Sequence, residues 1–289
     1  MKKVSVCMKT VPVFLLLAGM TGGGCTKVIN LTVPNASAQL VIQGNVTNAP
    51  GPYTVMLNST VPFSANNSFP AVDGAVVTIT DNMGVYDSLV ETSPGVYTTQ
   101  GQWQGQPGNT YTLHVTYNGV AYTGSSTMPQ PVNLDSVTFD QISRLKKVVI
   151  EVVPNFQDPP GGKYYYQFAE TINGEPLNKI FVYDDRLSSG KYIRQPLADD
   201  SADIAPGDYV ALSMYCVDQN TYTYFRELAQ QQNTGSFDAV LFTDVAPSDP
   251  SSNLSGGQGG ASGSGAAGGV LGYFSAHTVQ TEGGYASVQ

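Results

Sequence analysis

Short runs of alternating apolar and polar residues, each ended by a turn sequence, constrain this chain more than any other feature. In the stretch TYTLHVTY, the apolar and aromatic side chains share one face: Tyr111, Leu113, Val115 and Tyr117. The opposite face carries Thr112, His114 and Thr116. A two-residue period is that of a half-buried β-strand and does not fit a helix. The sequences APGP, SPG, QPGN and YNG separate such runs, because glycine, proline and asparagine supply the backbone angles of turns.

The spacing of these runs predicts a β-sandwich for residues 38–130. About seven short strands in about ninety residues, with no helical period between them, are typical of an antiparallel, immunoglobulin-like sandwich. The sequence YNGV at residues 117–120 predicts a tight hairpin, since Asn-Gly is favoured in two-residue β-turns. The segment MPQPVNLDS at residues 128–136 interrupts the pattern with two prolines, and we expect a domain boundary there.

Residues 131–289 are predicted to form a second β-rich domain with one helix. Strand-like runs occur in KKVVIEVVP, KYYYQFAETI and GDYVALSMYCVD. The helix is expected near residues 221–232, with Asn220 as its N-cap and Gly235 as its terminator. Its apolar stripe comprises Tyr222, Phe225, Leu228 and Ala229. We expect this stripe to pack on a sheet.

A tract rich in glycine and serine, residues 255–269, precedes the last strand-like run. A phosphate-binding P-loop needs Gly-Lys-Ser/Thr at the start of a helix, and the tract contains no lysine. A dinucleotide-binding turn needs a strand before it and a helix after it, and neither is predicted here. The tract is therefore expected to be a flexible surface loop.

The N-terminus has the pattern of a bacterial lipoprotein signal. Residues 1–24 combine a basic start, a short apolar run and small residues, and Cys25 follows. The apolar run is too short to span a bilayer, which takes about 20 residues. Acylation of Cys25 would anchor the mature chain to the outer membrane without a spanning helix. Residues 25–37 are then a tether. Lipoprotein signals usually have leucine three positions before the cysteine, where this chain has Gly22.

An ordinary secretory signal is the alternative to lipidation. Cys25 would then be a plain thiol or would pair with Cys216. Such a disulfide would join the extreme N-terminus to the far half of the chain, and Cys216 lies in an apolar run that suits a buried thiol. We therefore assign Cys25 as the lipid attachment site.

The charge of the mature chain excludes nucleic acid as a partner. Loss of the leader takes three lysines from the 13 Lys+Arg and none of the 22 Asp+Glu, which leaves a net charge of −12. Nucleic acids and polybasic membrane patches both need a cationic protein surface. Whether the protein faces the cell surface or the periplasm is left open by the sequence.

No residue pattern in the chain spells out catalysis, a metal site or a cofactor. His114 is expected on an exposed strand face, and His277 has no second His or Cys at ligand spacing. Acid pairs occur at Asp184–Asp185 and in ADDSADIAPGD, which contains Asp199, Asp200, Asp203 and Asp208. Their spacing does not match the EF-hand calcium loop. Trp103 is either an exposed aromatic contact or a cap on the sandwich edge.

Several sequence islands together resemble one family. They are LVIQGNVT, FPAVDGAVVTITDN, PGVYTT, QGQPGNTYTLHVTYNGVAY, VNLDSVTF, GDYVALSMYCVDQNTYTYFREL, SNLSGG and GVLGYFSAHTV. The chain resembles the Bacteroidota lipoproteins grouped as domain of unknown function 4249, from about residue 25 to about residue 280. The family usually runs from SN-x-x-GG directly into LGYF, whereas this chain inserts Gln258–Gly268.

The resemblance implies an outer-membrane lipoprotein, often encoded beside a TonB-dependent β-barrel transporter, and it brings no catalytic residues. We therefore expect a non-enzymatic accessory or solute-binding partner of such a transporter, with no cofactor. A structural or adhesive surface protein is the first alternative. A hydrolase of peptide or glycan is the second, motivated only by the carboxylates and the envelope location.

Overall fold

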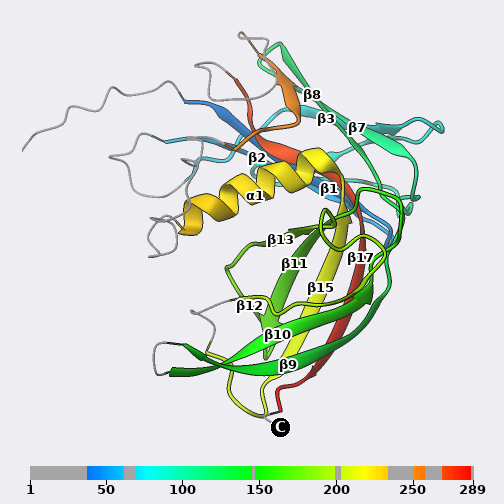
Figure 1. The fold of residues 1–289 in the computed structure, drawn as a ribbon. Coiled ribbons are helices and arrows are strands. Elements are labelled where there is room, and N and C mark those ends of the chain that lie inside the picture. The colour runs from blue at the N-terminus through cyan, green and yellow to red at the C-terminus, as the bar shows by residue number, and fades with distance from the viewer. Residues whose placement is uncertain are drawn as a thin grey trace, which may run out of the picture. The chain divides into compact units, whose positions relative to one another are not determined.

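The computed structural model describes residues 38–61, 69–144, 147–198, 203–233, 250–257 and 269–287. These ranges all belong to one unit, Ala36–Gln289. The leader, Cys25 and the tether lie outside the described residues, as do Asp199, Asp200, Gly235 and the insertion 258–268. The described chain is mainly β with one helix (Figure 1), as the sequence predicts. No helix in these ranges is long and apolar enough to cross a membrane.

Two sheets enclose the first core as a sandwich. One sheet contains β1 (Leu40–Thr47), β2 (Thr54–Ser59), β5 (Val90–Ser93) and β6 (Val96–Thr98). The other contains β3 (Val76–Asp81), β4 (Tyr86–Ser88), β7 (Thr110–Tyr117), β8 (Val120–Thr127) and β16 (Leu254–Gly256). Every neighbouring pair among these strands is antiparallel. The predicted sandwich is confirmed.

The alternation in β7 sets its orientation on the first core. Tyr111, Leu113 and Val115 are buried, while His114 between them is exposed. The strand joins β8 through a two-residue turn in which Asn118 has φ 49° and Gly119 has φ 76°. Positive φ at both positions is the geometry that favours Asn-Gly in hairpins. The predicted hairpin is therefore confirmed.

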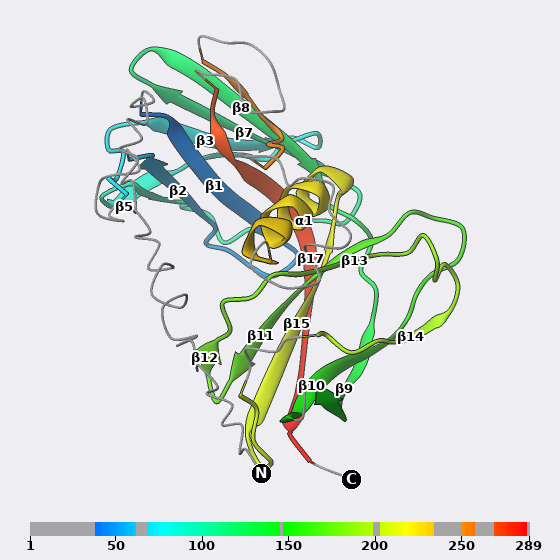
Figure 2. The ribbon, with the colours of Figure 1, turned by 60° about the vertical axis from the view of Figure 1, so that its left-hand side comes forward.

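The C-terminal strand β17 (Leu271–Tyr285) extends the β1 sheet into the second half of the chain (Figure 2). Its first part runs parallel to β1, from Leu271 beside Val41 to His277 beside Thr47. Its second part runs antiparallel to β15 (Tyr209–Val217). Beyond β15 lie β11 (Tyr165–Ile172), β12 (Glu175–Pro176) and β13 (Phe181–Asp184).

The described residues thus form a nine-stranded sheet that serves both halves of the chain. The first core takes Leu254, Val270 and Phe274 from beyond the predicted boundary at residue 130. Ser255 and Gly256, expected in the glycine-rich loop, are instead the end of β16, where they pair with β8.

A smaller sheet covers the second core. It contains β9 (Leu134–Arg144), β10 (Lys147–Gln157) and β14 (Tyr192–Arg194). Side chains from it and from β11 and β15 form the second cluster, including Val152, Phe156, Tyr166, Leu212 and Met214. Cys216 lies in this cluster as a free thiol, and burial raises its pKa.

The helix α1 (Gln219–Asn233) directly follows β15. It includes the predicted range, but its N-cap is Asp218 rather than Asn220. Asp218 Oδ1 accepts a hydrogen bond from Thr221 N at 2.8 Å, and Asn220 is already helical. The helix packs on the large sheet, as expected, with Phe225 against Tyr273 of β17 at a ring-centroid distance of 4.8 Å.

Candidate functional site

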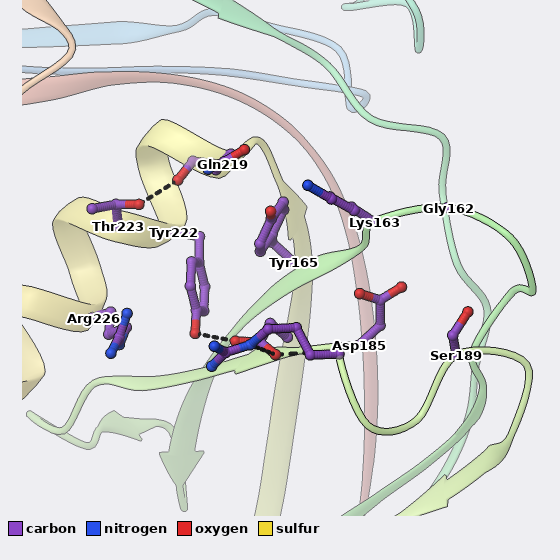
Figure 3. A pocket seen from close by; sticks show the side chains of 11 residues that line it. Gly162, Lys163, Tyr165, Asp185, Ser189, Gln219, Tyr222, Thr223 and Arg226 are labelled. Atoms are coloured by element: carbon purple, nitrogen blue, oxygen red, sulfur yellow. Dashed lines mark hydrogen bonds and ion pairs between the residues drawn. The ribbon is translucent and has the colours of Figure 1, made fainter.

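A cleft of about 460 Å³ lies between the first turns of α1 and the loops that flank β11 and β13 (Figure 3). Its volume falls within the range of small-molecule sites, roughly 300–1,000 Å³. The charged side chains that line it are Lys163, Asp184, Asp185, Arg186 and Arg226. Two tyrosines and several polar residues complete the lining.

The tyrosines Tyr165 and Tyr222 form an aromatic wall of this cleft. Their ring centroids are 4.9 Å apart and their planes are tilted by 34°. Tyr165 comes from β11, and Tyr222 comes from the first turn of α1. The two rings therefore tie the helix to the sheet while part of their surface borders the cleft.

Asp184 holds the floor of the cleft together. Its Oδ2 accepts a hydrogen bond from the Tyr222 hydroxyl at 2.6 Å, and its Oδ1 accepts one from Arg186 Nε at 2.8 Å. Burial raises the pKa of Asp184, but the bonds from Arg186 and Tyr222 outweigh it and the net shift is downward. Burial and the bond to Asp184 together raise the pKa of Tyr222 to about 12. The carboxylate is thus charged and the phenol protonated at neutral pH.

Two other cations of the cleft are available to a ligand. Lys163 and Arg226 are exposed, and neither forms an ion pair with another described residue. Arg186, in contrast, is paired with Asp184. Unpaired cations beside aromatic faces suit a polar solute that carries an anionic group.

A second set of polar groups adjoins the cleft through Asp185, which lines it. Asp185 is 3% exposed and Asp158 is fully buried. The Tyr166 hydroxyl donates a hydrogen bond to Asp158 Oδ1. Burial is the main cause that raises the pKa of Asp158; the bond from Tyr166 opposes it, and the charge of Asp185 adds to it. Asp158 belongs to no motif in the sequence, so sequence reasoning gives no sign that it is buried beside Tyr166.

The two histidines that the sequence singled out lie away from the cleft. His114 is exposed on β7, as expected. His277 is buried on β17, where its Nδ1 is 3.0 Å from Ser275 Oγ, and burial lowers its pKa to about 4. In the described ranges, no three His, Cys, Asp or Glu side chains gather closely enough for a metal ion.

Trp103 caps the sandwich rather than forming an exposed contact. Its ring stacks on Tyr111 at 5.9 Å, and its Nε1 donates to Asp87 Oδ2 at 2.8 Å. The described residues 203–208 of the sequence ADDSADIAPGD do not line the cleft either. Asp208 is partly exposed and accepts hydrogen bonds from Asn173 Nδ2 and Ala205 N, which lower its pKa.

The family model described as domain of unknown function (DUF4249) matches residues 26–282. The chain belongs to the DUF4249 family. The match spans the cleft, both cores and most of β17, so these are features of the DUF4249 region of the chain. No curated protein matches the chain. The resemblance expected from the sequence islands is therefore confirmed at the level of this family.

Proposed function

We propose that this DUF4249 protein is a non-enzymatic lipoprotein of the bacterial outer membrane, anchored through acylated Cys25, that binds a small polar solute for a TonB-dependent transporter. The leader and Cys25 support the anchor. The resemblance to Bacteroidota lipoproteins supports the membrane and the transporter. The cleft beside α1 supports solute binding.

The observation that best supports solute binding is that cations without an ion-pair partner and an aromatic wall line the same cleft. Lys163 and Arg226 offer charge-assisted hydrogen bonds to an anionic group, and Tyr165 and Tyr222 offer flat apolar surface. Asp184 and Arg186 neutralise each other at the floor, so they fix geometry rather than charge. A solute of this kind is an acidic oligosaccharide or a short peptide.

Binding can be tested with a panel of short acidic peptides and uronic-acid oligosaccharides, measured by calorimetry on the soluble chain from residue 26. Arg226→Ala and Tyr165→Ala should each weaken binding by about tenfold or more, which corresponds to 1.4 kcal/mol. Arg194→Ala is the matched control, because Arg194 is an exposed arginine paired with Asp140 outside the cleft. Equal affinity of all variants would remove the cleft from the proposal.

The anchor has its own test. Cys25→Ala should move the protein from the membrane pellet to the soluble envelope fraction and abolish labelling by palmitate. Continued labelling of the variant would show that another residue carries the lipid. The ordinary secretory signal predicts no labelling of either form.

The partner can be tested by purification from solubilised outer membrane. A β-barrel transporter should copurify at a fixed ratio with the tagged protein. Absence of any partner together with turnover of a peptide or glycan substrate would favour the hydrolase instead. Adhesion to cells or matrix without solute binding would favour the structural alternative.

A further inference from the structure

Two loops meet beside the cleft and bring two buried carboxylates together. Asp158 directly follows β10, and Asp185 directly follows β13. Asp158 N donates to Lys191 O at 3.0 Å, and Gly161 N donates to Ser189 Oγ at 3.4 Å. These bonds hold the loop after β10 against the turn after β13.

Three oxygen atoms in this region have no hydrogen-bond partner. They are Asp158 Oδ2, Asp185 Oδ2 and Ser188 Oγ. Each belongs to a residue that is at most 4% exposed. The serine hydroxyl is an observation independent of the acids, because it lies within the turn whose backbone folds over Asp185: Ser188 N donates to Asp185 O at 3.0 Å.

The carboxylates also lack a cation among the described side chains. No ion pair of the described residues includes Asp158 or Asp185. Asp158 lies against the turn that contains Asp185, because Asp158 N donates to Lys191 O and Lys191 N donates to Ser188 O at 2.8 Å. Two like charges buried near each other are strongly unfavourable unless a positive group compensates them.

We propose that a Ca²⁺ ion binds between Asp158 and Asp185, with Ser188 Oγ as a third ligand. The two carboxylates balance the charge of a divalent ion, and hard oxygen atoms are the ligands that Ca²⁺ prefers. Backbone carbonyls would supply the other oxygens of its shell of six to eight. The sequence alone does not predict this site, because Asp158 is distant in sequence from the acid pairs.

The ligand types decide between cations. No sulfur or imidazole nitrogen is present among these three groups, which disfavours zinc. Mg²⁺ retains several waters and requires near-ideal octahedral geometry, whereas the free oxygens here are closed off from solvent. Tyr166 acts as a positioning residue, since its bond to Asp158 Oδ1 leaves Oδ2 free for the ion.

The experiment uses the soluble chain from residue 26, stripped with chelator and free of any solute. Addition of CaCl₂ should raise the melting temperature by roughly 5 °C at saturation. Tb³⁺ should bind the same site and show luminescence sensitised by nearby tyrosines, and Ca²⁺ should displace it. Asp158→Asn and Asp185→Asn should abolish both signals, whereas Asp208→Asn, which changes a partly exposed acid of a different loop, should retain them.

The outcomes separate the alternatives. If neither Ca²⁺ nor Tb³⁺ changes the wild-type protein, the site is refuted, and higher stability of Asp185→Asn would then identify a shared proton in place of the ion. Stabilisation by Mg²⁺ equal to that by Ca²⁺ would overturn the choice of cation. Direct titration of the wild type tests the site even if a variant does not fold. Because no solute is present, failure here leaves the cleft proposal to its own test.

Discussion

His277 is a base that the fold keeps uncharged. The residue is 8% exposed, and its ring packs edge-on against Tyr215 at a centroid distance of 5.1 Å. Burial lowers its folded-state pKa to about 4, against the ordinary value of 6.5. Protons therefore bind the unfolded chain more tightly, so the full contribution to stability is present above about pH 6.5 and declines as the pH falls toward 4.

We expect this residue to lower the free energy of unfolding by about 2 kcal/mol between pH 7 and pH 5. Urea denaturation at the two pH values measures the change. His277→Gln is the control, because it removes the titrating group and keeps a polar side chain near Ser275. An unchanged pH dependence in that variant would show that other groups cause the loss.

Residue by residue, the two-residue period predicts burial where a strand has one covered face. It works for His114 and its neighbours on β7. It fails on β17, where residues 274–278 are all buried. Both faces are covered there, so the alternation that a sequence can show is lost. His277 could not be placed from its neighbours for that reason.

At the scale of elements, the Asp218 carboxylate links α1 to β8 and, through Ser126, to β17. Its Oδ1 caps α1, and its Oδ2 accepts a hydrogen bond from Ser126 Oγ of β8 at 2.6 Å. Ser126 Oγ in turn accepts from Ala276 N of β17 at 2.8 Å. The start of the helix is thereby fixed to both strands.

Asp218→Ala should destabilise the protein by about 2 kcal/mol, since it removes a cap and the acceptor of a buried hydroxyl. Asp218→Asn should recover most of this loss, because asparagine caps helices about as well as aspartate. Chemical denaturation of the three proteins gives the comparison. A loss no larger than that of an exposed Asp→Ala change would mean that the cap contributes little.

The extent of α1 follows from its sequence, but its first residue does not. Asp218 and Asn220 are both good N-caps, and the choice depends on β15 ending at Val217. The apolar stripe predicted for the helix also lacks one buried residue. Tyr224 is buried against Tyr273 of β17. The helical period alone does not predict this contact, because it does not show which strand the helix packs on.

At the scale of the molecule, local patterns predict the class of the fold but not its connections. Parallel pairing of β17 with β1 joins segments from opposite ends of the chain, and no turn sequence signals such a contact. The cleft is also nonlocal, because β11, β13 and α1 each supply part of it. Its residues could not be grouped before the strands were paired.

The predicted first domain, residues 38–130, should not fold alone. Without β17 the edge of β1 is open, and Leu254, Val270 and Phe274 are missing from the core. We expect the isolated fragment to aggregate or to unfold without cooperativity, whereas the chain from residue 38 to 289 unfolds cooperatively. Circular dichroism with heating distinguishes the two results. A cooperative transition of the fragment would show that the boundary at 130 separates independent domains.

The position of β17 also sets an order of events in time. A ribosome produces β1 long before β17, so the sheet that contains β1 waits for the chain between these two strands before they can pair. Proteins with domains complete in sequence can fold them one after another during synthesis. Here the first sheet lacks that pairing until β17 has been made, and a chain without it is one that a translocation channel can still thread.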